Sequence, residues 1–305
     1  MRQKREEIWA YLGLVLMTTI IGLSFIFVKL ALRHAPPGDL LAHRFTIATI
    51  GMVLFYLLFK RERPQIQKKH LVSLLTLSLF YPIMLFLMQT VGLQFTTASE
   101  AGILSATAPV FTLILAYFIL KEKSSIWQNL SVLLSVGGVI YIMYKNGIGE
   151  LSAETLKGDL FILLSVLSMA FYFVLGRKLN KKMNALDITF FMTVTACVIF
   201  NLIAVSRHVA NGTISEYFIA FRNSEFLWSI LYLGVLSSFL TSFLTNNALR
   251  IIPAAQVSIF NNFSPVITVF AGVLILSERL HHYHIIGGIM VLVGIIGVNV
   301  LKEKK

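Results

Sequence analysis

Two stretches of the sequence decide the fold: ASEAGILSATAPVFTLILAYFILKE at residues 98–122 and AAQVSIFNNFSPVITVFAGVLILSE at residues 254–278. Each has about 20 mostly apolar residues, which is the length that an α-helix needs to cross the hydrocarbon core of a bilayer. When the stretches are aligned from their first residues, Pro109 meets Pro265 and Glu122 meets Glu278. A shared central proline and a shared glutamate at the end indicate two copies of one membrane-spanning unit.

The remainder of the chain is equally apolar. It has 305 residues, of which 57% are hydrophobic and only 13% are charged, and its mean hydropathy is +0.80. A soluble domain carries roughly 25% charged residues, so most of this surface is expected to face lipid. The spans must be helices, because an open sheet edge would leave backbone groups unsatisfied in lipid. We predict ten spans, at residues 8–32, 40–59, 71–95, 97–120, 126–144, 158–179, 188–205, 226–249, 252–276 and 283–301.

The two copies divide the chain into two halves. The first five-helix unit covers residues 8–144, a polar linker covers residues 145–157, and the second unit covers residues 158–301. Because each unit has an odd number of spans, the second enters the membrane upside down relative to the first. The predicted fold is therefore all-α and integral to the membrane, with ten transmembrane helices arranged as two inverted five-helix repeats. Inverted repeats of this kind are typical of secondary transporters.

The distribution of basic residues predicts the orientation. With the N-terminus in the cytoplasm, the inner segments carry roughly three times as many Lys and Arg residues as the outer loops, as the positive-inside rule requires. Both termini are therefore expected on the cytoplasmic side of the inner membrane. These loops also explain the net charge of +12, so no nucleic-acid partner is expected. The apolar run after the basic start is too long for a signal peptide and is expected to remain as the first span.

Four segments of the sequence carry a resemblance to a known family. They are residues 97–122, residues 253–278, the stretch SFIFVK at residues 24–29, and the pair Arg44-Phe45. Over nearly its whole length the chain resembles the EamA family of the drug/metabolite transporter (DMT) superfamily. The resemblance implies a membrane carrier but does not identify the cargo, because members of the family carry amino acids, sugars and other metabolites. Glu100 departs from the family pattern, and this departure could concern the cargo of this protein.

Prolines near the span centres predict a binding site. Each proline removes a helix N–H and frees the carbonyl four residues earlier, at Ser105 and Asn261. Interrupted helices at matching places in two halves are the best indication of a transport site that a sequence offers. We predict that Pro109 and Pro265 break their helices and that Tyr81, Ser105, Asn261 and Asn262 contact the cargo. The alternative is a packing kink with hydrogen bonds between helices.

Among the charged residues in or near the predicted spans, Lys29, Arg44 and Glu100 are the candidates for function. Each lies a few residues from the outer end of its span, at a depth of roughly 5 Å. We predict that they form an outer gate or, for Glu100, a proton-coupling carboxylate. The alternatives are basic side chains that reach back to the interface and a simple ion pair. The residue aligned with Glu100 is the neutral Gln256, so the halves are not chemically equivalent.

Other motifs predict little further chemistry. The sequence has no Walker A motif, so ATP is not expected to drive the protein directly, and no cofactor or metal is expected. The tract with His281, His282 and His284 is predicted to be an interfacial loop, because histidines alone are a weak metal signal. Small residues in spans five and ten predict close helix packing, either between the halves or in a homodimer.

Together these features favour a secondary transporter of small metabolites, with export of amino acids or related compounds as the preferred activity. Uptake stays open, as does a flippase for lipid-linked substrates on the same fold. A membrane enzyme acting on lipid is disfavoured, because neither an H-E-x-x-H nor a G-x-S-x-G motif is present. The expected partners are a small-molecule substrate and membrane lipid.

Overall fold

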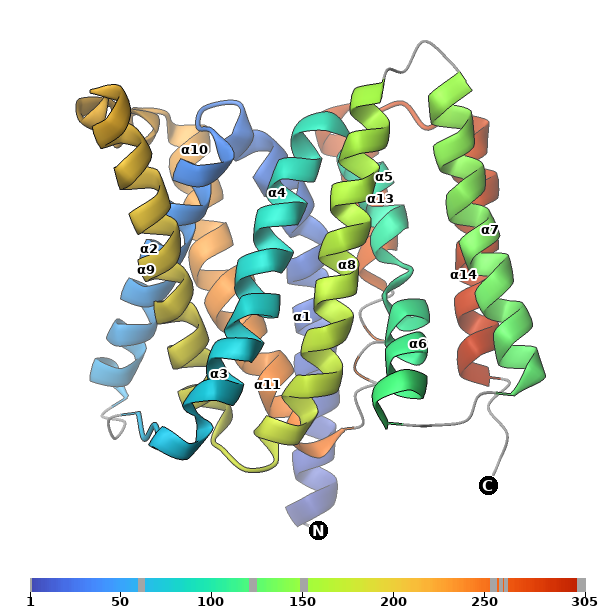
Figure 1. The fold of residues 1–305 in the computed structure, drawn as a ribbon, viewed down its shortest axis with the longest axis horizontal. Coiled ribbons are helices and arrows are strands. Elements are labelled where there is room, and N and C mark those ends of the chain that lie inside the picture. The colour runs from blue at the N-terminus through green and yellow to red at the C-terminus, as the bar shows by residue number, and fades with distance from the viewer. Residues whose placement is uncertain are drawn as a thin grey trace.

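The computed structural model describes residues 2–59, 64–120, 125–148, 153–252, 257, 260 and 263–300. All regular secondary structure within these ranges is helical. Figure 1 shows the long helices side by side and alternating in direction. Helix α1 (Arg2–Leu32) begins at the lower edge of this view, and helix α14 (His282–Val300) ends there. The first and the last helix of the chain therefore have their terminal ends on the same side of the bundle.

The helices of the first half follow α1 in chain order. They are α2 (Pro37–Leu58), η1 (Lys68–His70), α3 (Leu71–Ser78), η2 (Leu79–Met84), α4 (Leu85–Phe95), α5 (Ala98–Ser105), α6 (Ala108–Leu120) and α7 (Ile126–Ile148). The stretch from η1 to α4 is one continuous crossing, and α5 with α6 makes another crossing that is broken in the middle.

The helices of the second half precede α14. They are α8 (Ala153–Asn180), α9 (Ala185–Asn211), η3 (Ile214–Glu216), η4 (Ile219–Arg222), α10 (Ser224–Leu231), η5 (Tyr232–Leu240), α11 (Thr241–Ile251) and α13 (Phe263–Leu276). The stretch from α10 to α11 is again one continuous crossing.

The lengths and hydropathies of these helices fit membrane crossing. Within the described ranges, eight helical segments are long and apolar enough to span a bilayer, and two more apolar helices, Phe263–Leu276 and His282–Gly294, are shorter. Large apolar side chains such as Leu58, Val72 and Leu202 are exposed on the outside of the bundle, where a soluble protein would carry polar groups. The chain is therefore an all-helical, multi-pass membrane protein, as the sequence predicts.

A buried polar cluster holds the bundle at the end opposite the termini. Asp39, in the first turn of α2, accepts a hydrogen bond from Arg207 Nη2 (2.7 Å) and lies 3.0 Å from His208 Nε2. His208 Nδ1 lies 2.8 Å from Thr213 Oγ1, in the turn that Gly212 makes with a φ of 68° at the end of α9. These contacts fix α2 against α9, which are neighbours in the bundle.

The small residues of spans five and ten lie in the contact between α7 and α14. A Cβ atom on Gly138 would come within 2.7 Å of the Gly287 carbonyl oxygen and 2.9 Å of Met290 Cβ. Backbone atoms cannot move aside cheaply at such distances, so the two helices approach this closely only because position 138 has no side chain. The small residues therefore pack α7 of the first half against α14 of the second half. Packing between the halves is the first of the two possibilities that the sequence leaves open.

This contact yields a prediction with a neighbouring control. We expect Gly138→Ala to lower the stability of the purified protein by about 1–3 kcal/mol, the usual cost of overpacking. Gly137→Ala should be neutral or slightly stabilising, because its new Cβ would meet only Met290 Cε at 3.6 Å and alanine favours a helix. Thermal unfolding of both variants in detergent checks this. Equal melting temperatures would show that α7 and α14 do not pack as described.

Candidate functional site

The crossing that contains Pro109, one of the two predicted break prolines, is interrupted near its middle. Helix α5 ends at Ser105 and α6 begins at Ala108, so Pro109 lies in the first turn of α6, where its missing N–H costs no hydrogen bond. The turn between them is closed by Thr107, whose carbonyl accepts from the Val110 N–H at 2.9 Å. Pro265 likewise lies in the first turn of α13. Asn261 and Asn262, just before it, lie outside the described residues.

The third crossing is also irregular at its centre. Tyr81 has extended backbone angles (φ −137°, ψ 119°) inside the π-helical turn η2, and the following Pro82 is joined to it by a cis peptide bond. Its side chain points into the bundle, with the hydroxyl 3.0 Å from Ser242 Oγ and the ring stacked on Tyr172 at 4.3 Å between centroids. Another π-helical turn, η5, lies in the eighth crossing.

A small enclosed cavity lies where these irregular segments meet. Its volume is about 40 Å³, and the lining comes from both halves of the chain: Ile21, Ser24, Phe25, Tyr81, Leu85, Phe86, Gln89, Ser105, Ser165, Val166, Met169, Ser237, Thr241, Ser264 and Pro265. Ligand pockets usually measure roughly 300–1,000 Å³, so this conformation holds a few waters but no metabolite. In this conformation the cavity is therefore too small for a metabolite.

The cavity lining combines apolar and polar side chains, and some of the polar side chains have no hydrogen-bond partner among the described residues. The hydroxyl of Ser165 donates to the carbonyl one turn earlier, at Ile162. By contrast, Gln89, Ser105 and Ser264 line the cavity without a side-chain hydrogen bond to any described residue. Buried polar groups normally have partners, so these three side chains are free to bind water or a ligand. Ser105 was predicted from the sequence, whereas Gln89 and Ser264 were not.

Arg44 lies beside this cavity, in contact with Ser237 of its lining. Its side chain is completely buried, with Nε donating to Ser238 Oγ (2.7 Å) and Nη2 donating to Ser237 Oγ (2.9 Å). Helix α2 begins at Pro37, so a rise of 1.5 Å per residue places Arg44 about 10 Å along the helix. A fully buried side chain cannot be reaching back to the interface.

Lys29 and Glu278 border a second, open cavity of about 400 Å³ near the end of α1. The Glu278 carboxylate accepts hydrogen bonds from the backbone N–H groups of Ala98 (2.8 Å) and Ser99 (2.9 Å) and from the Ser99 hydroxyl. Glu278 thus caps the N-terminus of α5, which the sequence did not predict. It joins the end of α13 to the start of α5, one element from each half.

Glu100 lies in different surroundings, in the first turn of α5. It is buried, accepts a hydrogen bond from Thr96 Oγ1 (3.0 Å), and has His284 Nε2 at 3.9 Å from its Oε1. The prediction that His284 belongs to an interfacial loop is wrong, because α14 begins at His282 and buries His284 in its first turn. Lys29, Arg44 and Glu100 therefore have separate neighbours in this conformation: Glu278, the two serines of η5, and His284.

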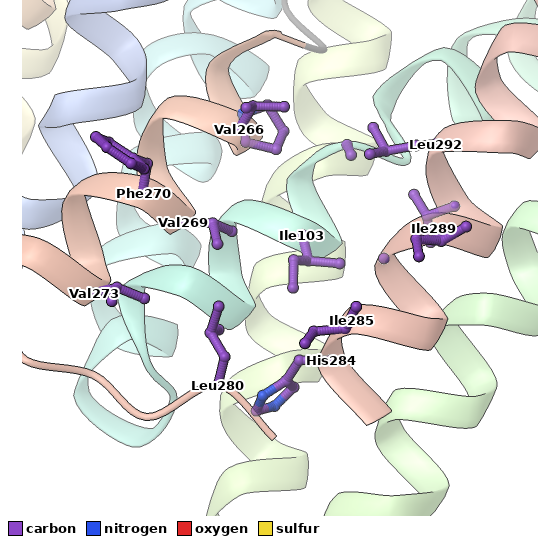
Figure 2. Close-up of a pocket in the computed structure, with 14 residues that line it drawn as sticks. Ile103, Val266, Val269, Phe270, Val273, Leu280, His284, Ile285, Ile289 and Leu292 are labelled. Carbon is purple, nitrogen blue, oxygen red and sulfur yellow. The ribbon is translucent and has the colours of Figure 1, made fainter. Parts of the chain in front are cut away.

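An apolar groove of about 480 Å³ opens between α13, α14 and α5. Figure 2 shows Ile103, Val269, Ile285 and Ile289 lining it, with His284 as the polar side chain at one end. Pro265 lines both this groove and the central cavity. The groove suits hydrocarbon, since its walls offer almost no hydrogen-bonding groups. Within the described part of the chain, no three His, Cys, Asp or Glu side chains come together as a metal site.

The fold and the site define a class of protein. A polytopic membrane protein with irregular helices around a central cavity that is partly lined by polar side chains has the arrangement of a membrane transporter. The chain belongs to the EamA-like transporter family, which matches residues 8–144 and 156–300. The family resemblance stated from the sequence is therefore confirmed.

Relatives of this chain are transporters as well. The uncharacterized transporter YcxC of Bacillus subtilis (strain 168) is 42% identical over 302 residues, which cover 99% of this chain and 96% of that protein. The uncharacterized transporter YetK of the same organism is 27% identical over 303 residues, covering 99% and 89%. A solved crystal structure with a TM-score of 0.62 and 14% identity covers 98% of this chain and 99% of that one, and it shows the same fold.

Proposed function

We propose that this EamA-family protein is a secondary transporter that exports amino acids or related small metabolites by alternating access between two inverted repeats. The observation that carries the proposal is the central cavity, whose lining comes from both halves and includes polar side chains without partners among the described residues. Transporters with inverted repeats bind their cargo at such a place, and one half rocks against the other around it.

The proposed repeats cover residues 8–144 and 158–301, joined by the linker 145–157, and give ten crossings in all. Helix α1 runs upward in Figure 1, whereas α8, its counterpart in the second half, runs downward. Helix α1 packs against α13 and α11, and α8 packs against α6 and α4, which are the same relations with the halves exchanged. This pattern supports an inverted two-fold relation between the repeats.

The proposed cargo site includes Tyr81 and Ser105, together with Asn261 and Asn262. Lys29 and Glu100 are proposed to close the route on the outer side, with Glu100 as the candidate for proton coupling. Arg44 takes a different role in this proposal, because it lies beside the cavity. The energy would come from an ion gradient or from the gradient of the cargo.

The protein is proposed to lie in the inner membrane with both termini in the cytoplasm. The basic inner loops support this orientation. Membrane lipid is the expected occupant of the apolar groove between α13 and α14. A homodimer is also proposed, with exposed apolar side chains of the outer helices as its contact surface.

Two alternatives differ from this proposal in what they require. A flippase for lipid-linked substrates needs a wide basic cleft open to lipid, whereas the groove is lined by aliphatic and aromatic side chains and His284. A membrane enzyme would need a nucleophile with a base or a metal cluster. Uptake uses the same site as export and differs only in which gradient drives the cargo.

Transport by the purified protein in liposomes tests the proposal. Vesicles loaded with labelled amino acids and other small metabolites should release at least one compound faster than vesicles without protein. Release should respond to an imposed pH gradient or to the same compound on the opposite side. If no compound moves under any gradient or with any counter-substrate, the carrier proposal is wrong.

A further inference from the structure

We propose that Arg44 is the anion-binding group of the cargo site, and hence that the transported compounds carry a carboxylate. This inference rests on the proposed transport function and names the substrate class of the same site. It starts from a guanidinium that is 0% exposed in the middle of a membrane-spanning bundle.

The guanidinium of Arg44 has no acidic partner among the described residues. Its two hydrogen bonds go to the neutral hydroxyls of Ser237 and Ser238, and its carbon Cζ lies 4.0 Å from the centroid of the Phe86 ring. The remaining nitrogen, Nη1, is buried without any hydrogen-bond partner in the described structure. Buried cations in membranes are costly and normally pair with an anion or mark a substrate path. The missing partner here is an anion.

The central cavity lies on the other side of the groups that Arg44 contacts. Ser237 and Phe86 both touch the guanidinium and both line the cavity. A turn of either side chain would therefore bring the guanidinium to the cavity without moving α2. Ser237 and Ser238 lie on the π-helical turn η5, whose irregular hydrogen bonding makes such a rearrangement local.

The chemistry of the cavity favours a carboxylate over other cargo. A guanidinium binds a carboxylate through two parallel hydrogen bonds, and it matches this planar group better than any other common side chain does. None of the described residues that line the cavity is acidic, so a purely cationic cargo would be repelled by Arg44 without a compensating negative charge. Gln89, Ser105 and Ser264 supply hydrogen bonds for the remaining polar atoms of an amino acid or a similar compound.

A purely structural role is the competing explanation for Arg44. The two serine hydrogen bonds also tie α2 to η5, and these elements pack together. A structural role would change folding or the overall rate of transport. It would not change which charge the cargo must carry, so charge selectivity separates the two explanations.

The experiment compares L-amino acids with their primary amides, which have the same side chains but no carboxylate. The wild-type protein in liposomes should carry the acids at least tenfold faster than the amides. In Arg44→Gln this ratio should fall to about one, while Arg44→Lys should keep part of it. Arg250→Gln, the same change at an exposed arginine at the end of α11, should leave the ratio unchanged.

Each outcome decides the matter. If the wild-type protein carries amides as fast as acids, the inference is wrong and the transporter proposal stands, even if Arg44→Gln fails to fold. If Arg44→Gln slows both classes equally, Arg44 has only a structural role. If neither class moves and no other metabolite does, the transport proposal itself fails and the inference fails with it.

Discussion

Gln89→Leu should weaken cargo binding about tenfold without lowering the stability of the protein. Gln89 lies on α4, is buried, and faces the central cavity with no side-chain hydrogen bond to a described residue. A ligand hydrogen bond to such a group is worth about 1–2 kcal/mol, and 1.4 kcal/mol corresponds to tenfold in affinity. Leucine has a similar shape and needs no hydrogen-bond partner, so the folded protein should keep or gain stability.

Two measurements on one preparation check this prediction. The half-saturating cargo concentration comes from transport in liposomes, and the melting temperature comes from the same protein in detergent. Gln94→Leu is the matched control, because Gln94 lies on the same helix but is exposed. An unchanged half-saturating concentration in Gln89→Leu would exclude this side chain from the cargo site. A large loss of stability would show instead that Gln89 has an essential structural partner.

The sequence predicts the membrane-spanning character of the chain because lipid imposes strong constraints on composition. Long apolar runs, charged joints and an interrupted helix at Pro109 can all be read from residue types. The α7–α14 contact is also anticipated, since glycines at close helix crossings leave a visible pattern. These features follow either from residues close together in the chain or from the preference of apolar side chains for lipid. Both can be read from the sequence directly.

The side-chain partners could not be predicted in the same way. Arg44 lies only four residues from the predicted start of its span, and the contacts of its side chain with Ser237 and Ser238 cannot be read from that position. In the sequence alone, Gln89 and Ser264 are ordinary polar residues of helices, because their place in the cavity lining depends on which helices surround them. His284 sits in a tract that resembles a loop, and only the packing of α14 beside α5 brings it near Glu100. Contacts between distant segments decide all of these positions.

Glu278→Ala should destabilise the protein strongly and loosen the connection between its halves. The carboxylate accepts from two backbone N–H groups, at Ala98 and Ser99, and from the Ser99 hydroxyl. Alanine would leave these donors without their partner in a partly buried place. The loss of a helix cap costs about 0.5–2 kcal/mol, and the loss of a negative charge at a helix N-terminus adds about 0.3–1 kcal/mol. We therefore expect Glu278→Ala to lower the free energy of unfolding by roughly 1–3 kcal/mol in total.

The matched comparison for this change is Glu216→Ala, which removes the same side chain from an exposed position in η3. Thermal unfolding in detergent should show a clear drop for Glu278→Ala and almost none for Glu216→Ala. Glu278→Gln should fall between them, because an amide oxygen still accepts hydrogen bonds but carries no charge. Equal melting temperatures for all three variants would mean that the α5 N-terminus does not depend on Glu278.

The cap at Glu278 also bears on transport, because its two ends belong to different halves of the chain. Helix α13 supplies the carboxylate just beyond its end, and α5 supplies the N–H groups at the start of a broken crossing that reaches Ser105 at the cavity. If the halves rock against each other, this contact must break or tilt with each cycle. Glu278→Ala should therefore shift the population toward the state open at this end, and an added cysteine at exposed Gln94 should react faster with a water-soluble thiol reagent in that variant. An unchanged reaction rate beside a lowered melting temperature would show that the cap stabilises the fold without controlling the opening.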